Sequence, residues 1–264
     1  MNPTTKPKLI DLNFGVHATM IPKKANGMNV HQLENLTFVD SGLSCDTFNI
    51  IHINNGLNIT PNEITLALDH FKRKSLDYCL WINSENLTEQ VQAYLEEHSL
   101  SQQGSEMGMS LDLVTYEPLD LKKHQNILEV VTEEQLIDFA NVIASNWTPP
   151  DPNVLEYYQK TAAHYLHQSS GVVLLVYYHE GTPLATVELF PTDHETIGIY
   201  GLATLEDARG QGIGSALMTF ALKKAKELNY KNVVLQASAD GLSIYQKIGF
   251  EAHNQYFEFA PTSQ

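Results

Sequence analysis

The stretch Arg209-Gly210-Gln211-Gly212-Ile213-Gly214 decides the fold of this chain. It follows an apolar run at 196–203 that predicts a strand, and it precedes an apolar pattern with helical spacing. The first N–H groups of a helix have no partner within the helix, and they lie at the positive end of its dipole. Because glycine has no Cβ, a phosphate can approach those amides closely. A multiply charged pyrophosphate is therefore the expected guest of this loop.

Three phosphate-binding patterns compete for these glycines. A P-loop needs a Lys and a Ser or Thr after its last glycine, and no Lys follows here. A dinucleotide fingerprint has Ser215 at its third glycine position and lacks an acidic residue about 20 residues later. The pattern Arg/Gln-x-x-Gly-x-Gly/Ala is matched in full by Arg209, Gly212 and Gly214. A tight turn that uses the glycines for geometry alone is the structural alternative.

Four features in the same order resemble the GNAT superfamily of N-acetyltransferases, over about residues 126–260. They are the strand at 196–203, the glycine loop, the strand at 233–237, and the segment 237–250 that ends in Tyr245-x-x-x-Gly249-Phe250. The resemblance implies an α/β fold of the α+β type, with a mixed, mostly antiparallel sheet flanked by helices. It also implies acetyl-CoA as cosubstrate and no metal.

The resemblance assigns roles position by position. The amides from Gln211 to Ser215 would hold the coenzyme pyrophosphate, and backbone groups of residues 202–204 would pair with the pantetheine arm as a false strand. Tyr245 matches the tyrosine that protonates the leaving thiolate, and Ser238 stands where many members have Asn. The predicted coenzyme-binding residues are Leu202, Ala203, Thr204, Arg209, Gly210, Gln211, Gly212, Ile213, Gly214, Ser215 and Ser238.

The reaction also needs a group that accepts a proton from the attacking amine. At pH 7 a lysine-like amine loses its proton at a cost of roughly 4–5 kcal/mol. The family often carries a glutamate on or near the strand before the loop, but residues 196–203 contain no acid. Glu188 is the preferred substitute, with Glu195 and a water relay as alternatives. Trp147, between two predicted helices, is a candidate for the wall of the acceptor pocket.

Two domains are predicted, 1–120 and 126–264, with the boundary in the polar segment 112–125. In the second, Thr132 opens a capping-box helix, another helix covers 154–166, and strands cover 172–178, 184–190, 196–203 and 233–235. The first repeats strand, helix, strand, helix, strand over 48–114 and resembles a second, degenerate acetyltransferase domain of tandem members. It has Asn54-Asn55-Gly56-Leu57-Asn58 where the second has the glycine loop, so coenzyme binding by that mechanism is not expected there.

Composition narrows the class of protein. Sixteen Lys and Arg against 31 Asp and Glu give a net charge of −15 over 264 residues, which disfavours nucleic acid and anionic membranes as partners. The two cysteines suit a reducing compartment, and neither a long apolar segment nor an export signal is seen, so a cytoplasmic location is expected. We expect a monomer or weak dimer.

The expected activity is transfer of acetyl from acetyl-CoA to a primary amine of a small molecule or peptide, by direct attack in a ternary complex. The alternative is a non-catalytic module that binds coenzyme A or a protein partner. The acidic balance favours a cationic acceptor through electrostatic steering.

Overall fold

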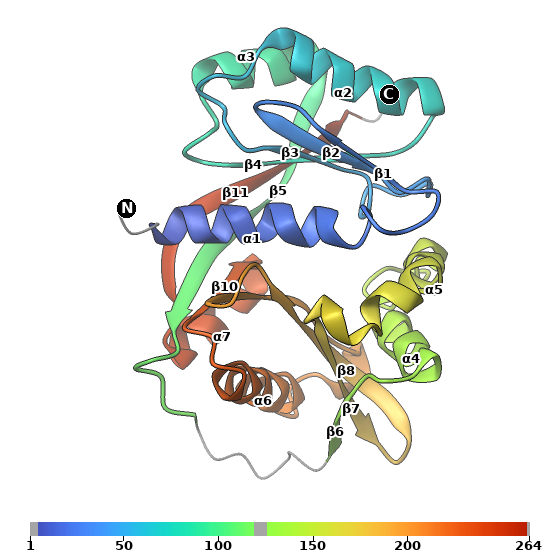
Figure 1. Cartoon of the computed structure of the whole chain (residues 1–264), viewed down its shortest axis with the longest axis vertical. Coiled ribbons are helices and arrows are strands. Elements are labelled where there is room, and N and C mark those ends of the chain that lie inside the picture. The colour runs from blue at the N-terminus through green and yellow to red at the C-terminus, as the bar shows by residue number, and fades with distance from the viewer. Residues whose placement is uncertain (1–4, 119–125, 263–264) are drawn as a thin grey trace. The chain divides into compact units, whose positions relative to one another are not determined.

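The computed structural model describes residues 5–118 and 126–262 (Figure 1). Contacts between Cα atoms divide the chain into two compact units. The first unit contains the residues up to Met109 together with those from Gln236 onward, and the second contains Ser110–Leu235. The first unit is therefore discontinuous in sequence, because residues from Gln236 onward pack with the residues up to Met109. Part of the expected boundary, residues 119–125, lies outside the described residues.

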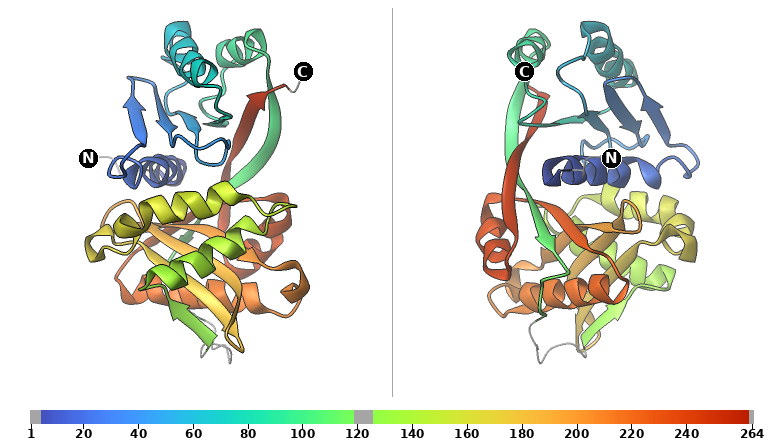
Figure 2. Two further views of the ribbon diagram at one scale, coloured as in Figure 1. Left: turned by 90° about the vertical axis from the view of Figure 1, so that its right-hand side faces the viewer. Right: turned by 60° about the vertical axis from the view of Figure 1, so that its left-hand side comes forward.

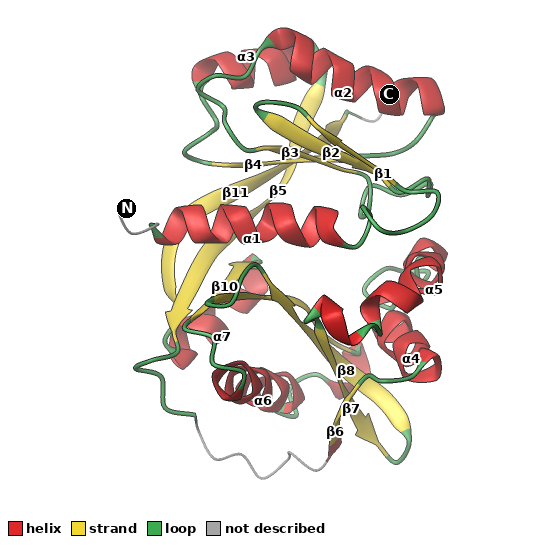
Figure 3. Ribbon diagram, viewed as in Figure 1, coloured by secondary structure: helices red, strands yellow, loops and turns green. Residues whose placement is uncertain are grey.

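The first unit combines three N-terminal helices with a mixed sheet (Figure 3). Its elements are α1 (Lys6–Met20), β1 (Asn29–Gln32), β2 (Leu36–Asp40), β3 (Ile50–Ile53), α2 (Pro61–Lys74), β4 (Cys79–Asn83), α3 (Glu89–Glu97), β5 (Leu100–Asp112), α7 (Ala239–Ile248) and β11 (Glu251–Pro261). The strands follow the order β1-β2-β3-β4-β11-β5. Strands β1, β2 and β3 pair antiparallel, as do β4 and β11, whereas β3 and β4 are parallel and joined by α2.

The two faces of this sheet differ in polarity because side chains alternate along each strand. One face carries the apolar core, in which Ile51, Ile53 and Leu80 pack with Phe71 of α2 and Leu95 of α3. The other face lies against α1 and is more polar. On that side His52 and Asn83 both contact Asp11 of α1, while the rings of Phe14 and Trp81 lie 5.6 Å apart.

The second unit is built from β6 (Ile127–Glu129), α4 (Glu133–Ala144), α5 (Pro152–Tyr165), the 3₁₀ turn η2 (Gln168–Ser170), β7 (Val173–His179), β8 (Thr182–Pro191), β9 (Thr196–Thr204), η3 (Glu206–Ala208), α6 (Ile213–Glu227) and β10 (Asn232–Ala237). The order of its strands is β10-β9-β8-β7-β6. Strands β6 to β9 pair antiparallel, whereas β9 and β10 are parallel and joined by α6. Figure 2 shows α4 and α5 on one side of these strands and α6 on the other.

The predicted fold class is confirmed: the chain is a mixed α/β protein with mostly antiparallel strands and two similar units. Each unit contains one parallel strand pair crossed over by a helix, β3-α2-β4 in the first and β9-α6-β10 in the second. The predicted helix start at Thr132 is also confirmed. Thr132 accepts a hydrogen bond from the Gln135 amide, and the Gln135 side chain accepts one from the Thr132 amide, so both halves of the capping box form.

The last strand of the chain pairs within the first unit. Phe257 of β11 stands opposite Ile82 of β4, and Tyr256 stands opposite Asn83. Along the sequence β11 follows the second parallel crossover, so it would belong to the second repeat. Its pairing partner instead comes from the first repeat.

Sequence reasoning did not find α1, β1 and β2. The buried side of α1 includes Asn13 and Thr19 beside Ile10 and Phe14, so its apolar periodicity is weak. The polar face of the sheet beneath α1 accounts for that composition. Among the described residues no helix is both long and apolar enough to cross a membrane.

Candidate active site

The loop between β9 and α6 leaves the N-terminus of α6 without a side-chain cap. Gly212 is the N-cap, with φ 75°, and it has no side chain that could accept a hydrogen bond from the first turn. The first hydrogen bond of the helix runs from the Ala216 amide to the Gly212 carbonyl, 3.0 Å. The amides of Ile213, Gly214 and Ser215 therefore have no acceptor within the helix. They are donors at the positive end of the helix dipole.

The space beside these glycines is open. A Cβ placed on Gly210 or Gly212 would meet no heavy atom within 4 Å beyond the chain neighbours. Both residues have positive φ, 73° and 75°, which glycine adopts without strain. A Cβ on Gly214 would lie 3.4 Å from Oγ1 of Thr204, an ordinary contact. An anion can therefore approach the loop without displacing a side chain at Gly210 or Gly212.

The longer side chains of the loop fold back along it. Nε of Arg209 donates to the Thr204 carbonyl at 3.0 Å. Nε2 of Gln211 donates to the Asp207 carbonyl at 3.2 Å. These bonds brace the loop, so Arg209 contributes to its shape as well as to its charge.

Strands β9 and β10 separate just before the loop. They pair only where Thr196–Gly198 stands opposite Asn232–Val234. Strand β9 continues to Thr204, paired with β8 along its other edge. From Ile199 onward, the edge of β9 that faces away from β8 is not paired with β10. Backbone groups on that edge are available to an extended ligand.

A β-bulge lies at the same level of β9. Thr186 of β8 stands opposite Ala203, but Glu188 stands opposite Tyr200, so Gly201 and Leu202 together oppose a single residue. Gly201 has φ 56°. Oγ1 of Thr186 donates to its carbonyl at 2.9 Å, which fixes the bulge.

The bulge distinguishes the three residues predicted to pair with pantetheine. The Leu205 amide donates to the Leu184 carbonyl at 2.9 Å. Because antiparallel pairs alternate, the backbone of Ala203 then points toward β8 and that of Thr204 points toward the open edge. Leu202 lies within the bulge itself.

Glu188 lies in a cluster of tyrosines within the second unit. The side chain is 2% exposed. Burial and the negative charge of Glu188 raise the pKa of Tyr157, Tyr158 and Tyr165, all on α5. The rings of Tyr158 and Tyr165 are 5.2 Å apart. Glu188 therefore stands at the level of the bulge, surrounded by hydroxyl groups that remain protonated at neutral pH.

Two further candidates from the sequence, Glu195 as proton acceptor and Trp147 as a wall of the acceptor pocket, lie at the surface. Glu195 forms an ion pair with Lys231, and that hydrogen-bonded partner lowers the pKa of the Glu195 carboxyl. A carboxylate held in this way is a weaker proton acceptor than a glutamate without a cationic partner. Trp147 is 41% exposed in the turn between α4 and α5.

Tyr245 and Ser238 belong to the first unit by contacts. The Tyr245 side chain is buried, with its ring 5.7 Å from that of Phe250. Burial, together with the charge of Glu106, raises the pKa of Tyr245 to about 12. Ser238 is the N-cap of α7, where its hydroxyl accepts a hydrogen bond from the Gly241 amide.

Sequence reasoning missed Glu106, on β5. Burial and the nearby Glu258 raise the pKa of Glu106 to about 7. Glu258 of β11 lies beside this part of β5, because a Cβ on Gly104, two residues before Glu106, would lie 3.0 Å from Oε2 of Glu258. No sequence signal joins Glu106 to Tyr245, since their proximity arises from strand pairing across most of the chain.

The first unit differs at the position of the glycine loop. The Gly56 amide donates to Oδ1 of Asn86 at 3.0 Å, and a Cβ on Gly56 would lie 1.7 Å from the Asn86 carbonyl oxygen. Helix α2 begins with a complete capping box between Thr60 and Glu63. Strands β3 and β4 stay paired from Ile50 to Ile53. The features that leave the second unit open are thus filled or closed here.

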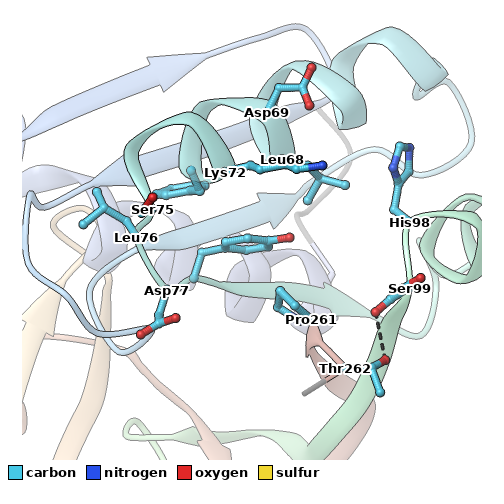
Figure 4. Close-up of a pocket in the computed structure, with 12 residues that line it drawn as sticks. Leu68, Asp69, Lys72, Ser75, Leu76, Asp77, His98, Ser99, Pro261 and Thr262 are labelled. Carbon is cyan, nitrogen blue, oxygen red and sulfur yellow. Dashed lines mark hydrogen bonds between the residues drawn. The ribbon is translucent and has the colours of Figure 1, made fainter. Parts of the chain in front are cut away.

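Two cavities open in the first unit. One, of about 590 Å³, lies at the C-terminal end of α2 (Figure 4). Its wall carries Asp69, Lys72 and Asp77, so charges of both signs line it. The other, of about 400 Å³, lies beside α1.

Residues 136–250 match the model of the acetyltransferase (GNAT) family. N-acetyltransferase 8B of Rattus norvegicus is 33% identical over 70 residues, which are 25% of this chain and 32% of that protein. The matched stretch thus spans about a third of the length of this curated relative. The match to the GNAT family therefore covers most of the second half of the chain.

Solved structures resemble the whole chain in fold. A GCN5-related N-acetyltransferase from Kribbella flavida has a TM-score of 0.69 at 16% identity, covering 96% of both chains. A tandem GNAT protein from the clavulanic acid biosynthesis pathway has a TM-score of 0.61 at 10% identity, covering 97% of this chain and 94% of that one. The fold is therefore that of a tandem GNAT protein.

Proposed function

We propose that the chain is an N-acetyltransferase that moves the acetyl group of acetyl-CoA to a primary amine. The observation that carries the proposal is the open edge of β9 beside the uncapped N-terminus of α6. An extended arm can pair with the first, and a pyrophosphate can bind the second. The match of residues 136–250 to the GNAT family model supports acetyl-CoA as the cosubstrate.

The predicted contacts of the glycine loop and of Thr204 have a physical basis in the second unit. The amides of residues 211–215 would bind the pyrophosphate, each contributing about 0.3–1 kcal/mol through the helix dipole, so several are needed together. Thr204 would pair with the pantetheine arm. The bulge at Gly201 and Leu202 would direct a backbone donor toward the thioester carbonyl, where negative charge develops.

The proton steps would use Glu188 and Tyr245. The nitrogen of the amine attacks the thioester carbon, its proton passes to Glu188 directly or through water, and the carbon–sulfur bond breaks. Tyr245 would supply the proton to sulfur. With the pKa of Tyr245 near 12 and a thiol near 8.5, complete transfer is uphill by about 5 kcal/mol. Tyr245 would therefore act chiefly as a hydrogen-bond donor to the departing sulfur, with a partial contribution to rate.

We propose further that the first unit has lost the loop mechanism of coenzyme binding. Asn86 occupies the place beside Gly56, and the capping box satisfies the start of α2. The same proposal includes a small-molecule or peptide amine as acceptor and a direct ternary mechanism. It also includes the absence of nucleic-acid and membrane partners, a monomer or weak dimer, and a cytoplasmic location.

A test of coenzyme binding uses Gly212→Ala with Gly181→Ala as its matched control. Both glycines have positive φ, 75° and 80°, and neither would place a Cβ within 4 Å of another residue. The backbone strain is therefore similar, but only Gly212 borders the loop. We expect Gly212→Ala to weaken acetyl-CoA binding in calorimetry at least tenfold, while the control keeps wild-type affinity. Equal affinity in both variants would contradict the phosphate loop.

A test of turnover measures thiol release from acetyl-CoA with a panel of polyamines, amino sugars, amino acids and peptides. Acceptor-dependent release that falls in Glu188→Gln and Tyr245→Phe supports the enzyme. Tight coenzyme binding with no release for any acceptor supports the alternative, a non-catalytic binding module.

A further inference from the structure

The cavity beside α1 has a polar floor within the first unit. Its wall includes Leu12 and Val16 of α1, and its floor includes His52 of β3 and Thr37 of β2, which stand opposite each other in the sheet. His52 is 4% exposed and Thr37 is 9% exposed. Burial of polar groups costs free energy that apolar side chains would not. A purely structural contact between α1 and the sheet does not require this composition.

The floor is organised around Asp11. Oδ1 of Asp11 lies 3.1 Å from Nε2 of His52, 2.7 Å from Nδ2 of Asn83 and 3.4 Å from the hydroxyl oxygen of Tyr256. Three donors thus converge on one carboxylate oxygen. These hydrogen bonds stabilise the Asp11 carboxylate, so its repulsion of an anion in the cavity is weaker than that of a bare carboxylate.

Two lysines line the same cavity. Lys8 stands near the start of α1 and Lys23 follows its end. Among residues 5–118 and 126–262, neither has a carboxylate partner in an ion pair. The chain has 31 acidic residues against 16 Lys and Arg. In such a chain, two lysines left free at one cavity form a local excess of positive charge.

We propose that the α1 cavity, formed by Lys8, Asp11, Lys23, Thr37, His52 and Asn54 with Leu12 and Val16, binds a small organic anion that carries a carboxylate or phosphate group. The lysines, at the two ends of α1, attract the anion through their long-range charge. The hydroxyl of Thr37 and the side-chain amide of Asn54 donate hydrogen bonds, and the apolar residues of α1 cover the rest of the ligand. A volume of about 400 Å³ suits a metabolite-sized molecule. This site is separate from the glycine loop and does not depend on the proposed function.

The test uses the full chain and thermal unfolding at constant ionic strength, with inorganic phosphate, succinate and 3-phosphoglycerate as probes. A ligand that binds the folded state raises the unfolding midpoint, and the shift keeps growing with the logarithm of the ligand concentration above Kd. We expect at least one probe at millimolar concentration to raise the midpoint of the wild type. In the double variant Lys8→Gln/Lys23→Gln the apparent affinity should fall at least tenfold.

The control is Lys24→Gln/Lys247→Gln, which has the same net charge but changes two exposed lysines outside the cavity. It should bind like the wild type. The measurements are repeated in Gly212→Ala, because phosphate can also bind the glycine loop, and the effect of Lys8 and Lys23 should persist there. An equal loss in both lysine variants means an adventitious ion only, and no shift with any probe also overturns the proposal.

Gly15→Ala provides a variant that keeps every charge. A Cβ there would lie 3.3 Å from Nδ1 of His52, so it narrows the cavity. Alanine favours the helix over glycine, while the close contact with buried His52 acts against it, so the unliganded variant is first shown to unfold cooperatively. We expect weaker binding of 3-phosphoglycerate by the folded variant. Unchanged binding in this variant would place the ligand elsewhere.

Discussion

Glu106 is a carboxyl group in a site that favours its neutral form. Its pKa is raised to about 7 by burial and by Glu258. In the unfolded chain a glutamate has a pKa near 4.3. The folded state therefore binds this proton more tightly than the unfolded state does. The stability it confers is complete below pH 4 and is lost as the pH rises through 7.

Glu106→Gln removes this dependence. We expect the variant to gain stability over the wild type as the pH rises from 4.5 to 8, by at most about 3 kcal/mol. Urea unfolding at both pH values measures the difference. Glu258→Gln is the control, because it lowers the pKa of Glu106 and should move the change to lower pH. A constant difference between wild type and Glu106→Gln would show that Glu106 titrates normally.

Among single residues, the glycine loop could be predicted from its local sequence. The site features that depend on contacts between residues far apart in sequence could not. The glycines at 210, 212 and 214 could be recognised as a phosphate-binding loop because the geometry of such a loop depends on its own residues. The splay of β9 from β10, the compensated charge of Asp11 and the neighbours of Tyr245 depend on residues far away in sequence. The pattern of a single sequence does not show which distant residues come into contact.

Helix starts distinguish the two units at the scale of elements. Helix α2 begins with a reciprocal capping box, whereas α6 begins at a bare glycine. A cap satisfies the donors that an anion would otherwise bind. The same structural position is thus closed in one unit and open in the other.

The capping box of α4 permits a direct measurement. Thr132→Ala removes the acceptor for the Gln135 amide, 3.3 Å away. We expect the free energy of unfolding to fall by about 1 kcal/mol. Thr182→Ala, at an exposed position of β8, should change it by less than about 0.5 kcal/mol. Equal effects of the two substitutions would mean that the cap contributes nothing.

Helices and strands were predicted correctly where the apolar pattern was strong. Helix α1, which covers polar groups, was not predicted. The periodic helix at 132–144 and the strands from 172 to 204 are confirmed. Helix α1 escaped because it covers His52 and Asn83 rather than a hydrocarbon surface. Its cavity and its weak periodicity have the same cause.

The whole molecule joins its repeats through β11. Because β11 pairs with β4, a fragment of residues 126–264 lacks the strand that stands opposite Tyr256 and Phe257. An unpaired apolar strand edge promotes aggregation. We expect this fragment to be insoluble or unfolded alone and to be rescued by co-expression with residues 1–120. Circular dichroism and size-exclusion chromatography measure both, and a soluble, cooperatively unfolding fragment would contradict the expectation.

The position of β11 also orders events during synthesis. Asn83 leaves the ribosome about 170 residues before its partner Tyr256, a delay of roughly 9–35 s at 5–20 residues per second. Until then, one edge of β4 waits without its neighbour. The nascent chain completes its first sheet only after the whole second repeat has been synthesised, so a ribosome that stalls within that repeat would hold a half-finished sheet that chaperones must shield.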